Sequence, residues 1–91
     1  MITALQIFTK ALETATGHSY VSSVTYTPLR MPAYKEFHFV LKQFDGKENE
    51  RKVYQMSYRE RVTNNEEKEY AMQVLTEKFI SYVLQDIIKN S

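Results

Sequence analysis

Residues 35–62, KEFHFVLKQFDGKENERKVYQMSYRERV, alternate aromatic or aliphatic side chains with polar ones through a turn and back again. Alternation with a period of two is typical of a β-strand with one buried face, and DGKENE interrupts it with turn-forming residues. We therefore expect an antiparallel hairpin of Lys35–Phe44 and Arg51–Arg61. Its buried face should carry Phe37, Phe39, Leu41, Tyr54 and Met56.

A helix and a further strand are expected before this hairpin. Thr3 and Gln6 have the spacing of a capping box, and Gly17 can adopt the left-handed conformation that ends a helix, so the first helix should span Thr3–Thr16. The β-branched and aromatic stretch Ser19–Thr27 predicts a strand. PLRMPA, residues 28–33, contains both prolines of the chain and should form an irregular connection at a sheet edge.

A second helix should follow the hairpin. Thr63 and Glu66 repeat the capping-box spacing, and acidic residues follow where the helix dipole favours them, so the helix should run from about Asn64 to Lys89. The expected fold class is α+β. Residues 1–91 would form one small domain, with the order helix, three antiparallel strands, helix, in which both terminal helices pack on the sheet.

The apolar residues of this last helix change direction along its length. On a helical wheel, the early group is centred roughly 170° from the later one. The early group is Tyr70, Ala71, Val74 and Leu75, and the later group is Phe79, Ile80, Val83, Leu84, Ile87 and Ile88. One flat sheet buries a stripe little more than about 100° wide. The later group should be covered either by the first helix or a helix bend, or by a second subunit or partner protein.

Candidate interface residues follow from the second of these alternatives. Tyr82 lies beside the later apolar group, and Tyr34 follows the proline-containing connection, where amphipathic rings can serve an interface. The predicted protein interface therefore consists of Tyr34, Ile80, Tyr82, Leu84, Ile87 and Ile88.

Several classes of function are disfavoured by composition. Twelve basic and eleven acidic residues give a net charge of +1, which supplies no surplus to neutralise phosphates. The chain has no cysteine, and neither His18 nor His38 has a second ligand at metal-binding spacing. Catalysis by Ser22, Ser23 or Ser57 would need a positioned base that the sequence does not identify. We expect no catalytic residue, metal, cofactor, small-molecule substrate or nucleic-acid site.

The same features bear on localisation. The absence of cysteine fits a reducing compartment, and MITALQIFTKALE has neither the basic leader nor the apolar run of a secretory signal. The sequence also has no run of 18 apolar residues, so we expect no membrane-spanning helix and a cytoplasmic protein.

Two protein families share the expected order of elements. Double-stranded-RNA-binding domains dock phosphates on a lysine-rich start of the last helix, whereas this chain has TNNEEKEYA there. The start MITALQIF, with ERKVYQMSYRERVTNNEEKEYAMQVLTEKF later, resembles small tail-terminator and minor tail proteins of long-tailed phages. That resemblance implies a ring in which the hairpin and the final helix assemble to close the tail tube, and a virion-associated location.

We therefore expect a non-enzymatic protein-interaction or assembly module, a phage structural protein if the resemblance holds. The alternatives are a small inhibitor or adaptor, of the kind phages encode, that binds one host protein, and a module like the double-stranded-RNA-binding domain.

Overall fold

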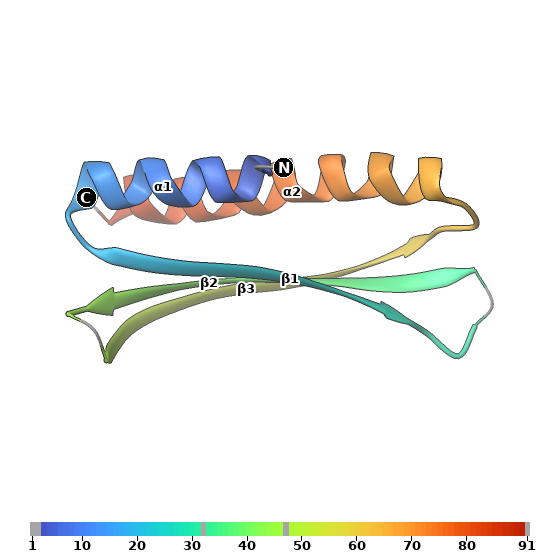
Figure 1. Ribbon diagram of the computed structural model, residues 1–91, viewed down its shortest axis with the longest axis horizontal. Coiled ribbons are helices and arrows are strands. Elements are labelled where there is room, and N and C mark those ends of the chain that lie inside the picture. Colours follow the sequence, from blue (N-terminus) through green and yellow to red (C-terminus); the bar gives the residue numbers. More distant parts are fainter. Residues whose placement is uncertain (1–2, 32, 47, 91) are drawn as a thin grey trace.

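The computed structural model of the chain describes residues 3–31, 33–46 and 48–90. It confirms the α+β fold class and the order of the elements. Figure 1 shows two helices and three strands: α1 (Ala4–Thr16), β1 (Ser19–Pro28), β2 (Tyr34–Asp45), β3 (Asn49–Arg61) and α2 (Asn65–Lys89). The strands form an antiparallel sheet in the order β1-β2-β3, so β1 and β3 are its edges.

Both helices lie on the same face of the sheet (Figure 1). They run in the same direction, and α1 begins near the middle of the molecule. At about 1.5 Å per residue, the 13 residues of α1 span about 20 Å, whereas the 25 residues of α2 span about 37 Å. The helical layer is therefore complete over one half of the sheet and contains only α2 over the other half.

The core lies between the sheet and both helices, and the fully buried side chains at its centre come from β2 and α2. Phe37, Phe39 and Leu41 of β2 have no exposed surface, and the ring of Phe79 stacks on Phe39 with 5.4 Å between centroids. Tyr54 is also buried and Met56 is half-buried against the same cluster. The predicted buried face of the hairpin is thus confirmed, because its alternation matches the pleat of the sheet.

The expected change of buried direction along α2 does not occur. Leu75, Phe79 and Val83 lie four residues apart, and each is at most 1% exposed, so they form one continuous stripe on the sheet. Tyr70, from the early group, is 71% exposed. These fully buried side chains at four-residue steps hold one side of α2 on β2 and β3, and the other apolar residues of the helix flank them.

The helix starts differ by one residue from the predicted positions. The capping box of Thr3 and Gln6 is present, and α1 begins at Ala4. Gly17 ends α1 in the left-handed conformation, with φ 76°. Asn64, not Thr63, caps α2, because its side-chain oxygen accepts from the backbone N–H of Glu67 at 2.9 Å.

Candidate functional site

The predicted interface residues do not lie on one surface. Ile80 and Ile87 are half-buried on one flank of α2, where Leu84 is 39% and Ile88 70% exposed. Tyr82 lies on the opposite flank, with its ring 6.0 Å from that of Tyr54 on β3. Tyr34 begins β2 and alternates with the core residues, which places it on the sheet face away from the helices. Only the group on the first flank can act as a single contact surface.

An α1 residue extends that surface. Ala4 of α1 and Thr76 of α2 line the same groove, and the helices run in the same direction (Figure 1). Ile7 lies one turn further along α1 and is 60% exposed, and from the parallel alignment of the helices we infer that it lies on the same outer side of the layer as Ile80. We call Ile7, Ile80, Leu84 and Ile88 the helix-layer patch. The sequence signal for Ile7 is its position off the buried stripe of Leu5 and Leu12.

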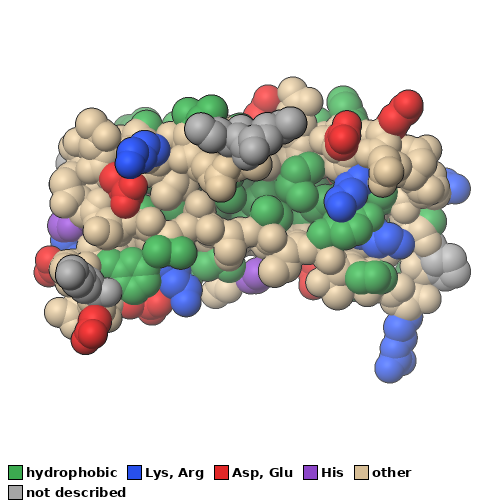
Figure 2. Space-filling view, in the orientation of Figure 1, with side chains coloured by type: hydrophobic (Ala, Val, Ile, Leu, Met, Phe, Trp, Pro, Cys, Tyr) green, Lys and Arg blue, Asp and Glu red, His purple; other side chains and the backbone are tan. Residues whose placement is uncertain are grey.

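A groove opens where α1 is missing from the helical layer. It has a volume of about 740 Å³ and lies between the start of α1 and the first half of α2. Its lining residues are Thr3, Ala4, Asn65, Lys68, Glu69, Met72, Gln73, Thr76 and Glu77. Beside it, the ammonium of Lys68 lies 4.5 Å from the ring centroid of Tyr26 on β1. We call this space the half-layer groove; Figure 2 shows apolar side chains gathered in this half of the molecule, with basic side chains among them.

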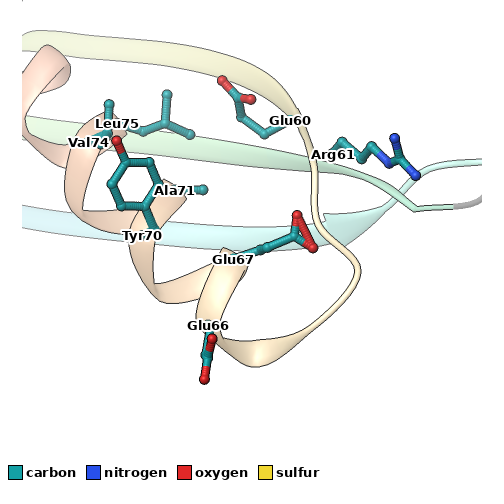
Figure 3. Close-up of a pocket in the computed structure, with 8 residues that line it drawn as sticks. All are labelled: Glu60, Arg61, Glu66, Glu67, Tyr70, Ala71, Val74 and Leu75. Carbon is teal, nitrogen blue, oxygen red and sulfur yellow. The ribbon is translucent and has the colours of Figure 1, made fainter.

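A smaller pocket of about 440 Å³ lies between the end of β3 and the start of α2. Figure 3 shows Tyr70 near Val74 on one side, Glu60 and Arg61 on the strand, and Glu66 directed away from the others. Glu67, at the rim, accepts from the backbone N–H of Thr63 at 3.1 Å and from its hydroxyl. These bonds lower the pKa of Glu67. This carboxylate therefore fixes the entry to α2, and its role there is structural.

A polar cluster fastens the end of α2 to β3. The Tyr54 hydroxyl donates to the Asp86 carboxylate at 2.7 Å, and the Lys52 ammonium donates to the same oxygen. The hydrogen bond from Lys52 is the main cause that lowers the pKa of Asp86, and the one from Tyr54 is the next. The same hydrogen bond to Asp86 raises the pKa of Lys52. Burial is the main cause that raises the pKa of Tyr54, and its hydrogen bond to Asp86 raises this pKa further. Lys52 thus lies on the helix side of the sheet, not among the polar residues of the other face.

The sheet face away from the helices is mixed in character. Nδ1 of His38 lies 2.6 Å from Oγ of Ser57, and Arg59 forms an ion pair with Glu36 at 3.9 Å. A serine and histidine at this distance could in principle form a nucleophile and base, but both are on an open strand surface and neither lines the pockets described above. Catalysis would also require donors placed for an oxyanion. The pair is better explained as a cross-strand hydrogen bond.

Within residues 3–31, 33–46 and 48–90, no group of three or more histidine or acidic side chains is arranged to hold a metal ion. Neither α1 nor α2, in the part of the chain that the structure describes, is long and apolar enough to cross a membrane. Comparison of the chain with protein-family models, curated proteins and solved structures finds no match to any of them.

Proposed function

We propose that this protein is a non-enzymatic binding module that assembles with copies of itself or with a partner protein. The helix-layer patch carries this proposal. Its members are aliphatic, and Ile7, Leu84 and Ile88 are all more than a third exposed on the outer side of the molecule. Contiguous exposed apolar side chains are characteristic of protein interaction sites.

Packing on the sheet accounts for the buried apolar residues along α2, but it does not account for the helix-layer patch. Leu75, Phe79 and Val83 supply the contact with the sheet, and Asp86 fastens the C-terminal end of the helix to β3. Leu84 could be polar without loss of these contacts. An apolar residue at such a position contributes little to folding and becomes useful when a protein partner covers it.

The resemblance to tail-terminator and minor tail proteins supports the assembly form of this proposal. It implies a ring, and a ring needs contact surfaces on the outside of each subunit. In that case the protein would be virion-associated and its partners would be copies of itself and other tail proteins. In the adaptor form, the same patch would bind one host protein.

A double substitution, Leu84→Lys with Ile88→Lys, tests the proposal. We expect both the parent and this variant to fold, with free energies of unfolding within about 1 kcal/mol of each other, because the substituted positions are exposed. In sedimentation equilibrium, the largest assembly formed by the variant should have a lower mass than the largest assembly formed by the parent. Ser81→Lys with Gln85→Lys adds the same charge at exposed positions of α2 and should leave assembly unchanged.

The contrary result is also specific. The proposal is wrong if the parent is a monomer at every concentration and the Leu84→Lys, Ile88→Lys variant loses several kcal/mol of stability, since the patch would then be part of the fold.

A further inference from the structure

The two edges of the sheet differ in charge and regularity. β1, SYVSSVTYTP, has ten residues and no charged side chain, and it pairs with β2 in one register from Ser19 to Pro28. β3, NERKVYQMSYRER, has six charged residues, and its register shifts at Gln43 and Phe44 of β2. Charges and bulges are the usual means of keeping an edge strand from pairing with another chain. β3 has both, and β1 has neither.

The backbone of β1 presents free pairing groups at regular intervals. The N–H of Tyr20 donates to the Glu13 side chain at 3.2 Å, away from β2, and the N–H of Leu29 donates toward β2, to Tyr34 at 3.1 Å. Because these directions alternate along an antiparallel strand, the N–H and C=O groups of Ser22, Val24 and Tyr26 point to the open edge. Figure 2 looks onto this edge and shows few charged side chains along its middle.

The helical layer above β1 is half empty. The Thr9 hydroxyl donates to Oγ of Ser22 at 2.9 Å, so the middle of α1 lies over the first part of β1. The ten residues of β1 extend about 33 Å, whereas α1 spans only about 20 Å. Near the start of α1, Val24 is 37% exposed, and the half-layer groove begins at Thr3 and at Ala4 of α1.

We propose that β1 pairs antiparallel with β1 of a second copy of this chain, around a two-fold axis at Val24. This inference rests on the proposed function in making the protein self-assembling, but it uses the β1 edge and not the helix-layer patch. Ser22, Val24 and Tyr26 then form three hydrogen-bonded pairs across the axis, with two backbone bonds in each. Tyr20, whose N–H is already bound, lies opposite Pro28, which has no N–H to donate.

A second copy fits this edge better than an unrelated strand for two reasons. An uncharged strand opposes no like charges when it pairs with itself. The two-fold operation also reverses the direction of the strand, so the α1 helix of the second copy lies beside the half of β1 that α1 leaves uncovered. The two short helices together then complete a layer over a continuous six-stranded sheet, and the half-layer groove receives its missing neighbour.

A single cysteine tests the position of the axis, since the chain has no cysteine of its own. Val24→Cys brings its two copies to a Cα separation of about 5.5 Å across a hydrogen-bonded pair, which a disulfide can span. Mild oxidation should give a disulfide-linked dimer of twice 10.8 kDa. The matched control is Val53→Cys, a similarly exposed valine on β3, which should remain monomeric under denaturing, non-reducing conditions.

A second variant weakens the pairing of the two β1 strands without introducing a charge. Val24→Pro eliminates an N–H that points away from β2, as edge strands tolerate. Losing both bonds of the central pair should raise the dimer Kd about 30-fold, with the urea midpoint of a dilute monomer close to that of the parent. Should this variant fail to fold, the cysteine pair still decides the question.

Three results overturn the inference: a parent that is monomeric at every concentration, Val24→Cys that crosslinks no better than Val53→Cys, or folded Val24→Pro that dimerises like the parent. If Val24→Pro dimerises like the parent but the Leu84→Lys, Ile88→Lys variant assembles less, the inference about β1 is wrong and the proposed function still holds. Retention of the Val24-dependent dimer in a folded Leu84→Lys, Ile88→Lys variant supports the inference and separates the two surfaces.

Discussion

Single buried aromatic residues determine how α2 sits on the sheet. Phe39 lies at the centre of β2, contacts Phe79 by stacking, and meets the ring of Tyr58 edge-on at 5.8 Å. Phe39→Ala should therefore lower the free energy of unfolding by about 3–5 kcal/mol, because the cavity lies between two packed layers. Val53→Ala, at an exposed position, should change it by less than about 0.5 kcal/mol. A urea melt showing less than about 1 kcal/mol for Phe39→Ala would contradict this packing.

The Asp86 cluster should make stability depend on pH at both extremes. The pKa of Asp86 is lowered, so the unfolded chain binds more protons in acid, and stability should fall as pH drops from the usual aspartate range toward the folded pKa. The pKa of Lys52 is raised, so its contribution is complete below the usual lysine pKa and is lost as pH rises through the folded value. Both trends should weaken in Asp86→Asn.

Urea midpoints measured across acid, neutral and alkaline pH check this prediction. Asp45→Asn, an exposed change at the end of β2, should retain the pH profile of the parent. If Asp86→Asn and the parent have parallel profiles, the cluster does not couple α2 to β3.

At the scale of whole elements, the strands were more predictable than the packing of the helices. Alternation directly specifies which side of a strand is buried, so Phe37, Phe39 and Leu41 were identified from the sequence alone. For α2, the wheel weights every apolar residue equally, and it therefore missed that Leu75, Phe79 and Val83 suffice for the sheet contact. The burial of an apolar helix residue depends on how far the neighbouring elements extend. The sequence alone does not show that α1 covers only part of the length of β1.

The candidate surfaces were predictable to a smaller degree. Leu84 and Ile88 follow from the amphipathic pattern and are exposed, whereas Ile7 joins them only because α1 and α2 run side by side. The β1 edge needed the strand order, since a strand becomes an edge only through its position in the sheet. Its lack of charge is visible in SYVSSVTYTP, but that feature acquires meaning once β1 is known to be outermost.

At the scale of the whole molecule, the two proposed surfaces lie on different sides. The helix-layer patch faces away from the sheet, and the β1 edge lies in the plane of the sheet, as the layered view in Figure 1 illustrates. A two-fold contact through β1 closes on itself, so it yields only a dimer. Growth beyond a dimer, including a ring, requires a second contact such as the helix-layer patch. Loss of the patch alone should therefore leave dimers.

The charge distribution of the whole molecule predicts that it does not bind nucleic acid at physiological salt. The net charge is +1, Glu66 and Glu67 occupy the first turn of α2, and basic residues of the open sheet face such as Arg59 and Lys42 are paired with Glu36 and Glu50. With a balanced net charge and these basic residues paired, binding would release few counterions from phosphates. Titration of labelled duplex DNA and RNA should show no micromolar binding.

As a control, Glu66→Lys with Glu69→Lys places basic residues at the start of α2 and should create weak, salt-sensitive binding. Micromolar binding by the parent that falls steeply with added salt would instead support a module like the double-stranded-RNA-binding domain.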